Sequence, residues 1–433
     1  MKALLYSLTI GLLIAGISQA DPSKPNFIFI MADDLGYGDI SSFGSQTIET
    51  PHIDSIGKLG ARLTDFHSNG TVCSPTRAAL MTGRYQQRSG VTGVVTAKGH
   101  RDKGLLLDET TFAEVLSEAG YATAMFGKWH LGYEAAFNPT HQGFDEFKGF
   151  VSGNIDYHHH IDQAGFKDWW QQAELKDEPG YLTDLITEHS LDFVERHSEK
   201  PFCLVLNHGA PHYPLQGRST PGFRTKGNTK VNVPVDKPKA IYKEMIEVMD
   251  EGVGKLIDQL KSAKILDNTM IIFCSDNGPA RTGDAGPLRG LKGQVWEGGH
   301  RVPAVVMWPA RIPSGQTLDQ TMMTMDMFAT FLAAAGIKDV ADLELDGIDL
   351  LPALSEGKAL PQRTLFWAFK DDWAVRSGPW KVVSTQKKTQ LFNLDEDLGE
   401  KTDLSEKFDQ RKQEMIKAYE RWKKETKSAT PVS

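Results

Sequence analysis

Short hydrophobic runs along the chain end abruptly in polar or charged residues. Four of these runs span residues 26–31, 121–126, 202–207 and 270–274. Runs of this length that stop at polar residues are typical of buried β-strands. Between them, apolar residues recur at helical spacing, in one segment from Phe112 to Ala119 and in another from Ile241 to Leu260. This spacing predicts amphipathic helices, so strands and helices alternate along most of the chain.

The alternation predicts an α/β fold with a large, mostly parallel or mixed sheet that helices cover on both faces. Polar side chains follow each of the four runs; they are Asp33 and Asp34, Lys128 and His130, His208 and His212, and Asp276 and Asn277. In sheets of this kind, ligands bind beyond the carboxyl ends of the strands. We therefore expect the four clusters to meet in one cleft.

Two folded units are predicted. A boundary between residues 354 and 363 separates a large α/β domain, residues 21–360, from a small C-terminal α+β subdomain, residues 361–433. In the subdomain, short β-like segments precede a helix at about 408–425; the segments are 365–369, 373–376, 380–383 and 390–394. This order predicts an antiparallel sheet with a helix packed on it. The Pro-, Gly- and Lys-rich segment 216–239 is predicted to be a surface loop.

Residues 1–20 have the features of a signal peptide. Lys2 precedes an apolar run from Leu4 to Ile17, and Ser18-Gln19-Ala20 offers small residues before a cleavage point. A membrane-spanning anchor is the alternative, but the run is shorter than the roughly 20 apolar residues that a span needs. No cysteine follows the cleavage point, so a lipid anchor on the mature N-terminus is not expected. We expect a periplasmic or secreted protein without a membrane anchor after cleavage.

The 433 residues carry a net charge of −8, which argues against a nucleic-acid partner because proteins that bind nucleic acids present a basic face. The three cysteines are too few for a disulfide framework. Cys203 and Cys274 lie in apolar runs and are expected to be small buried residues. Cys73 lies in a polar segment, so its presence needs another explanation.

Asp33-Asp34 and Asp276-Asn277 are candidate metal ligands. Each pair follows a predicted strand, and adjacent carboxylates repel each other unless a cation or a shared proton relieves them. A helix cap or a turn is the alternative for either pair alone. Together the pairs offer the oxygen ligands that Ca²⁺ prefers, or Mg²⁺ with more waters. No cysteine–histidine cluster with zinc spacing competes with them.

The segment Cys73-Ser-Pro-Thr-Arg77 precedes the helix-forming residues Ala78-Ala-Leu-Met81. Pro75 suits the first turn of a helix. Cys73 would then lie at the helix N-terminus, where backbone N–H groups and the helix dipole favour an anion. A thiol of depressed pKa or a simple capping turn fits the pentapeptide as well, so the residues alone leave these interpretations open.

The segment CSPTRAALMTGR, residues 73–84, resembles the signature of the type I sulfatases, in which the cysteine is oxidised to Cα-formylglycine. The resemblance covers most of the chain, because further motifs occur in the family's order: Asp33-Asp34, Gly127-Lys128-Trp129-His130-Leu131-Gly132, Pro211-His212-Tyr213-Pro214, Ser275-Asp276-Asn277-Gly278, Leu291-Lys292-Gly293, Glu297-Gly298-Gly299, 373–380 and Leu391-Phe-Asn-Leu394. Thr76 stands where many members have serine, which keeps the hydroxyl. Three cysteines cannot form the disulfides of animal arylsulfatases, which points to a bacterial-style member. The resemblance implies the alkaline-phosphatase superfamily and, within it, a bacterial polysaccharide sulfatase.

The resemblance implies a role for each matched residue. It implies a Ca²⁺ ion held by Asp33, Asp34, Asp276, Asn277 and residue 73. It implies that Arg77 and Lys128 orient the formylglycine and the sulfate, that Lys292 binds sulfate, and that His212 protonates the leaving oxygen. His130 would assist proton removal from the second hydroxyl of the hydrated aldehyde, and Asp276 would activate the first. As isolated residues, the histidines could equally be packed in the core and the lysines solvated. A formylglycine-generating enzyme is the implied maturation partner.

The implied reaction is hydrolysis of sulfate monoesters on a sulfated glycan, an algal polysaccharide or a glycosaminoglycan oligosaccharide. One alternative is a phosphonate or phosphate monoester hydrolase of the same superfamily. Another is a catalytically silent glycan-binding relative, which the retained acid, nucleophile precursor and metal ligands argue against. The run from Asn154 to His158-His159-His160 is a candidate substrate-pocket loop or simply a polar loop, since no carboxylate or cysteine spacing completes a zinc site there. Trp169-Trp170 is a candidate sugar platform, or an aromatic pair of the core or of a lid.

Overall fold

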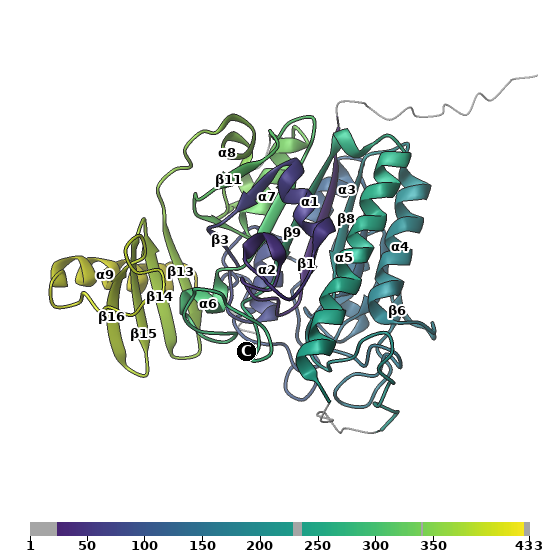
Figure 1. Ribbon diagram of the computed structural model, residues 1–433, viewed down its shortest axis with the longest axis horizontal. Coiled ribbons are helices and arrows are strands. Elements are labelled where there is room, and N and C mark those ends of the chain that lie inside the picture. Colours follow the sequence, from purple (N-terminus) through teal and green to yellow (C-terminus); the bar gives the residue numbers. More distant parts are fainter. Residues whose placement is uncertain (1–23, 228–235, 339–340, 428–433) are drawn as a thin grey trace, which may run out of the picture.

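The computed structural model describes residues 24–227, 236–338 and 341–427. The predicted signal peptide, residues 1–20, and part of the predicted loop 216–239 lie outside the described residues. Within the described ranges, no helix is both long enough and apolar enough to cross a membrane. A large α/β body carries a smaller, C-terminal sheet at one side (Figure 1).

A ten-stranded mixed sheet forms the centre of the large body. In spatial order its strands are β11 (Gln316–Leu318), β2 (Ala61–Leu63), β10 (Ala304–Met307), β9 (Thr269–Ser275), β1 (Asn26–Ala32), β8 (Phe202–Asn207), β4 (Ala122–Lys128), β5 (Glu146–Phe150), β6 (Trp170–Gln171) and β7 (Glu174–Leu175). Strands β9, β1, β8 and β4 are neighbours and run parallel. Strand β10 runs antiparallel to both of its neighbours. The predicted large, mostly parallel or mixed sheet is confirmed.

Both faces of the sheet are buried at its central strands, which explains the unbroken hydrophobic runs. In β1, Phe27 and Phe29 pack on one face, and Ile28 and Ile30 pack on the other. The face with Ile28 is covered by α1 (Pro51–Leu59), α4 (Leu182–His197) and α5 (Pro238–Ser262). The opposite face is covered by α2 (Cys73–Thr82), α3 (Phe112–Glu118), α7 (Asp326–Ala334) and α8 (Leu351–Glu356). Helices α4 and α5 lie side by side on their face (Figure 1).

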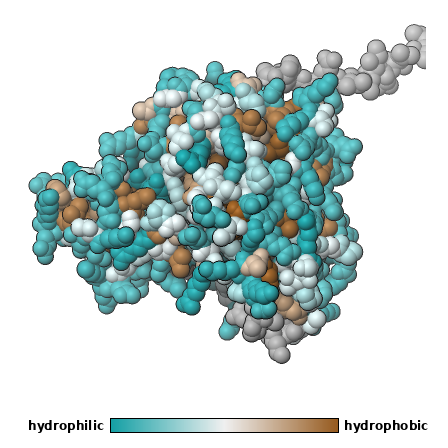
Figure 2. Space-filling view, viewed as in Figure 1, coloured by the Kyte–Doolittle hydropathy of each residue, from teal (hydrophilic) through white to brown (hydrophobic). Residues whose placement is uncertain are grey.

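The C-terminal part forms a four-stranded antiparallel sheet whose strands follow sequence order. They are β13 (Thr364–Phe369), β14 (Asp372–Ser377), β15 (Trp380–Thr385) and β16 (Lys388–Asn393). Helix α9 (Asp409–Glu425) packs on this sheet, and Tyr419 stacks on Trp373 with ring centroids 4.2 Å apart. The predicted antiparallel sheet with its helix is confirmed, while the exact domain boundary stays a prediction. The face in Figure 2 is mainly hydrophilic, with small hydrophobic patches between polar side chains.

A cluster of buried charges joins the C-terminal sheet to the large body. Lys381 on β15 is fully buried and contacts Glu297, in the short helix α6 (Glu297–His300), at 2.9 Å and Glu400 at 3.0 Å. Arg376 on β14 contacts Asp65 of the large body at 2.7 Å. Separating a buried pair would leave a charge uncompensated. These contacts therefore hold the two parts in one arrangement.

Strand β4 is longer than the predicted run 121–126, so Lys128 is the last residue of a strand rather than part of the loop that follows. Gly127 allows this extension, with a φ angle of 103°. A Cβ atom at this position would lie 2.0 Å from the carbonyl oxygen of Asn207 on the neighbouring strand β8. Only glycine permits so close an approach next to Lys128.

We expect Gly127→Ala to lower the free energy of unfolding by about 2 kcal/mol or more, because it adds a backbone clash to a strained φ angle. Denaturant titration measures this loss. Gly120→Ala is the matched control, since its φ angle is also positive, at 85°, and nothing lies within 4 Å of the added Cβ. The control should lose only the strain contribution, about 1 kcal/mol. Equal losses would show that the approach to Asn207 is unimportant.

Candidate active site

The four predicted polar clusters meet at the carboxyl ends of four neighbouring parallel strands. Asp33 follows β1, Lys128 ends β4, His212 lies beyond β8 and Asp276 follows β9. Helix α2 begins at Cys73, and the Sγ atom of this residue lies 3.4 Å from Asp33 Oδ1. The expected convergence of the clusters is confirmed, and the N-terminus of α2 points into the same place.

Three carboxylates at this site each contact one cation. The N–O pairs are Lys128–Asp33 at 2.6 Å, Lys292–Asp34 at 2.7 Å and Arg77–Asp276 at 2.8 Å. Lys128 and Arg77 are almost completely buried, whereas the Lys292 side chain is 23% exposed. The alternative that these lysines are solvated surface charges is therefore wrong.

Two of these carboxylates differ strongly in pKa. Burial raises the pKa of Asp33 to about 7, because Lys128 offsets only part of the desolvation. Burial opposes ionisation of Asp276 as well, but the charges of Arg77 and Lys128 outweigh it and lower its pKa to about 2. Asp276 Oδ1 also accepts a hydrogen bond from the backbone N–H of Asp34 at 3.2 Å. A further cation at the site would stabilise the ionised form of Asp33.

Cys73 is 1% exposed. Its Sγ atom lies 3.4 Å from both Asp33 Oδ1 and Lys292 Nζ. Burial, followed by the negative charge of Asp276, raises the pKa of the thiol well above its ordinary value. The encoded thiol is thus protonated at neutral pH and is a poor nucleophile. The direction of this shift is opposite to the one that a reactive thiol of depressed pKa requires.

His130 and His212 both line the cavity above Cys73. His130 Nε2 bonds to the carbonyl oxygen of Val95 at 3.0 Å, and His212 Nδ1 bonds to that of Tyr213 at 2.7 Å. Since a carbonyl accepts hydrogen bonds, these nitrogens carry the hydrogens. Burial lowers the pKa of both residues, that of His212 to about 3. Each neutral ring therefore keeps a lone pair, on Nδ1 of His130 and on Nε2 of His212.

The oxygen atoms at the site fit a divalent cation. Asn277 Oδ1 is buried and has no hydrogen-bond partner among the described residues, while its Nδ2 donates to Asp34 Oδ1 at 2.8 Å. Asp33, Asp34, Cys73 and His212 each offer one atom that could bind a metal ion, and these four atoms lie within 4.8 Å of one another. Carboxylate and amide oxygens are the ligands that Ca²⁺ prefers. A cation bound here would give the buried amide oxygen of Asn277 the partner that it lacks among the described residues.

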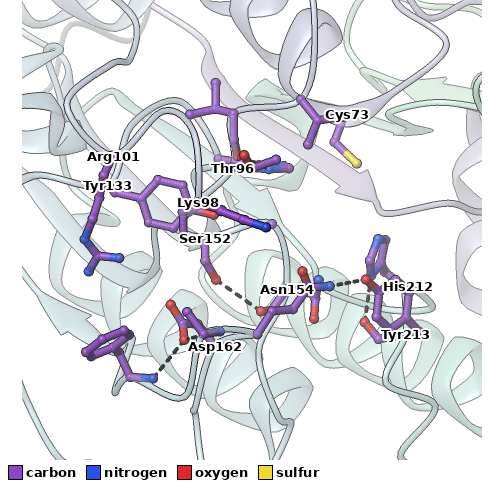
Figure 3. A pocket seen from close by; sticks show the side chains of 18 of the residues that line it. Cys73, Thr96, Lys98, Arg101, Tyr133, Ser152, Asn154, Asp162, His212 and Tyr213 are labelled. Carbon is purple, nitrogen blue, oxygen red and sulfur yellow. Dashed lines mark hydrogen bonds between the residues drawn. The ribbon is translucent and has the colours of Figure 1, made fainter. Parts of the chain in front are cut away.

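The site opens into a cavity of about 890 Å³, which is large enough for a ligand well beyond a single sulfate group. Cys73, His130, His212 and Lys292 line this cavity. Figure 3 shows Cys73 and His212 at one side of it. Arg77 is held behind them, because its Nη1 donates to the backbone carbonyl of Lys128 at 3.0 Å. The predicted catalytic residues thus divide into four that face the cavity and two that support them.

Other cavity residues were not singled out from the sequence. They come from the loop after α2 and from the segments after β4 and β5, and include Thr96, Lys98, Arg101, Tyr133, Ser152, Asp162 and Phe166. In Figure 3, Arg101, Tyr133 and Asp162 lie on the side of the cavity away from Cys73 and His212. These residues belong to irregular segments without hydrophobic periodicity, so no pattern in the sequence brings them together.

Of the predicted substrate-pocket loop 154–160, Asn154 lines the described cavity, whereas the other residues of that loop and Trp169-Trp170 are absent from its lining. His158 and His159 bond to backbone carbonyls of the segment 216–227. His160 stacks on Trp169 with ring centroids 5.0 Å apart, and Trp169 is 1% exposed. The second interpretation, a polar loop and packed aromatic residues, describes them.

Known proteins are similar to this chain in sequence and in fold. The sequence model of the sulfatase family matches residues 25–337. N-acetylgalactosamine-6-sulfatase of Sus scrofa is 33% identical over 383 residues, covering 81% of this chain and 70% of the relative. Arylsulfatase A of Bos taurus is 33% identical over 482 residues, covering 96% of this chain and 89% of the relative.

Among solved structures, Ps i-CgsB in complex with k-i-k-neocarrahexaose superposes with a TM-score of 0.84 at 32% identity. The match covers 92% of both chains, so it includes the large body and the C-terminal sheet. The family match spans the ten strands of the large sheet, the helix that begins at Cys73 and the carboxylates around it. The chain belongs to the sulfatase family, and it is a sulfuric ester hydrolase.

Proposed function

We propose that this protein hydrolyses sulfate monoesters on a sulfated glycan, with residue 73 as the nucleophile. The observation that carries the proposal is the position of Cys73. The residue begins helix α2, and its Sγ lies 3.4 Å from Lys292 Nζ. It lines one cavity together with His130 and His212, which can move protons. This arrangement supplies a nucleophile, a cation and two proton-transfer groups at one point.

The charge at the site suits a sulfate ester better than a phosphate ester. The three cations Arg77, Lys128 and Lys292 are matched by three carboxylates in direct contact. Only a divalent cation would then make the site positive. A phosphate monoester carries one more negative charge than a sulfate monoester and needs more compensating charge. The near-balance of the protein charges therefore favours sulfate over the phosphate alternative.

A protonated thiol at residue 73 cannot perform the attack, which supports conversion of Cys73 to Cα-formylglycine by a maturation enzyme. Hydrated formylglycine supplies two geminal hydroxyls, one to attack sulfur as the sulfur–oxygen bond to the sugar breaks, and one to expel sulfate and restore the aldehyde. We assign a Ca²⁺ site to Asp33, Asp34, Asp276, Asn277 and residue 73. Bound calcium supplies positive charge next to the sulfate oxygens.

The remaining side chains move the protons. Asp276 is the proposed acceptor of the proton of the attacking hydroxyl, since Arg77 and Lys128 keep its carboxylate ionised. His212 is the proposed donor to the leaving oxygen. Burial and Lys292 keep its pKa low, and a bound anionic ester offsets the charge of Lys292, so that His212 gains a proton. His130 Nδ1 has no hydrogen-bond partner among the described residues, and it is the proposed acceptor of the proton of the second hydroxyl.

The substrate class comes from the relatives and from the cavity. The relative from Sus scrofa is named for N-acetylgalactosamine 6-sulfate, and Ps i-CgsB binds k-i-k-neocarrahexaose. The cavity of about 890 Å³ has room for sugar residues around the sulfate. We propose an algal polysaccharide or a glycosaminoglycan oligosaccharide as substrate. Export through the predicted signal peptide 1–20 would bring the enzyme to such polymers.

Sulfate release from defined sulfated oligosaccharides tests the proposal. We expect the purified, calcium-loaded protein to release inorganic sulfate from at least one glycan series and to leave an aryl phosphate and a phosphonate monoester uncleaved at a comparable enzyme concentration. Preference for the phosphate or phosphonate would move the activity to the alternative reaction. Binding of a sulfated oligosaccharide by fully matured, calcium-loaded protein without any sulfate release would identify a silent glycan-binding relative.

A further inference from the structure

A second cationic region lies in the same cavity as Cys73. Lys98 and Arg101, on the loop that follows α2, both line the cavity and both side chains are exposed. The only acidic residue among the described lining residues is Asp162. Apart from Lys292 at the nucleophile, these two residues give the outer part of the cavity an excess of positive charge.

The guanidinium group of Arg101 is held by aromatic rings rather than by a carboxylate. Its Cζ lies 5.0 Å from the ring centroid of Phe166 and 5.7 Å from that of Tyr133. Both rings belong to the cavity lining, and Phe166 is 53% exposed. Contacts of this kind orient a guanidinium and leave its N–H donors available.

Within the described parts of the chain, neither Arg101 nor Lys98 forms an ion pair. Two other exposed arginines behave differently, since Arg196 contacts Glu146 and Asp192. Arg218 likewise pairs with two carboxylates. Asp162, the acidic residue of the cavity, uses its Oδ1 to accept hydrogen bonds from two backbone N–H groups of its own loop. The donors of Arg101 are therefore free for a ligand.

The loop that carries Arg101 is tied to the nucleophile. The backbone N–H of Val95 donates to Ser74 Oγ at 3.1 Å, next to Cys73, and the carbonyl of Val95 accepts the hydrogen bond from His130 at 3.0 Å. Arg101 lies six residues further along the same loop and faces the cavity from the side away from Cys73 (Figure 3). A ligand could therefore place one anionic group at Cys73 and another at Arg101.

We propose that Arg101, with Lys98 beside it, binds a second anionic group of the substrate while the sulfate to be cleaved lies at Cys73. This inference rests on the proposed function and narrows it to polyanionic glycans. The second group is a further sulfate or a carboxylate of a neighbouring sugar, since both present the oxygens that a guanidinium binds through two hydrogen bonds. Arg101 is a specificity-determining residue in this account and takes no part in bond breaking.

Steady-state kinetics of Arg101→Gln on matched substrates test the proposal. The substrates are one oligosaccharide with a single sulfate, the same oligosaccharide with a second sulfate on the next sugar, and a version with a uronate there. We expect the variant to lose about tenfold or more in kcat/KM on a doubly charged substrate. On the singly sulfated substrate its kcat/KM should stay within about twofold of the unchanged protein. A loss confined to the disulfated or to the uronate substrate identifies which anionic group is bound.

Lys103→Gln is the matched control, because it removes the same charge from the same loop at a residue that does not line the cavity. It should affect all substrates equally and weakly. Equal kcat/KM losses for Arg101→Gln on singly and doubly charged substrates, or no loss on either, would overturn the proposal. Sulfate release from the singly sulfated substrate would still stand in those cases, so failure of this inference is distinct from failure of the proposed function.

Discussion

Replacement of Cys73 by alanine is expected to abolish turnover, lowering kcat by at least about 10⁴-fold. Alanine has no side chain that can become an aldehyde, so the variant lacks the nucleophile. Cys73→Ser should be equally inactive under steady-state conditions where serine is not converted. A serine sulfate ester would have no second hydroxyl to expel sulfate, so the enzyme would be trapped after one transfer. Sulfate release under substrate excess measures both losses.

The fold should survive both Cys73 substitutions. Cys73 is buried, but its packing contribution is that of a small side chain, and helix α2 retains Pro75 in its first turn. We expect melting temperatures close to that of the unchanged protein. Cys203→Ala provides a comparison, since it removes another buried thiol far from the charged cluster and should keep full activity. Activity near the original level in Cys73→Ala would contradict the role of residue 73.

Removal of the divalent cation is expected to lower kcat by roughly 10³-fold or more, since the positive charge on the sulfate oxygens is lost. Burial raises the pKa of Asp33 to about 7 when only protein charges surround it. Without the ion, the buried Asn277 Oδ1 has no hydrogen-bond partner among the described residues. Calcium at 100 times its Kd should also raise the free energy of unfolding by about 2.7 kcal/mol. Dialysis against a chelator, metal analysis, and kinetic and melting assays measure these effects.

Adding back single ions separates calcium from other cations. Ca²⁺ should restore turnover, and Mg²⁺ should restore less, because Mg²⁺ demands a tighter octahedral geometry with several waters. Asn277→Leu removes one proposed ligand at similar volume, so its calcium affinity should fall in calorimetry. Full activity in protein shown to be free of metal would refute the calcium site. If Mg²⁺ restored turnover as fully as Ca²⁺, the proposed preference of the site for calcium would be wrong.

Much of the architecture could be predicted because it depends on local pattern. The run before Asp33 is continuous and hydrophobic, and its residues alternate between two buried faces of one sheet. Parallel strands end at the same edge, so Asp33 and Asp276 could be placed together although they are 243 residues apart. The helix that begins at Cys73 follows from Pro75 and the alanines after it.

The unpredicted features depend on contacts between irregular segments. Lys381 looks like an ordinary charged strand residue, and only the folded structure buries it against Glu297 and Glu400. His130 has a positive φ angle of 59°, and its ring bonds to the carbonyl oxygen of Val95. Neither feature can be predicted from the spacing of residues in the sequence. Arg101 reaches the cavity through a loop whose course is set by tertiary contacts. Specificity residues of this kind become visible only with the fold.

The mass of the tryptic peptide that contains residue 73, taken from a preparation of known specific activity, tests the central claim most directly. We expect the peptide to carry an aldehyde in place of the thiol. Across preparations of different maturation, kcat calculated per total protein should rise in proportion to the modified fraction. A fully active preparation in which residue 73 is still an unmodified cysteine would contradict the account.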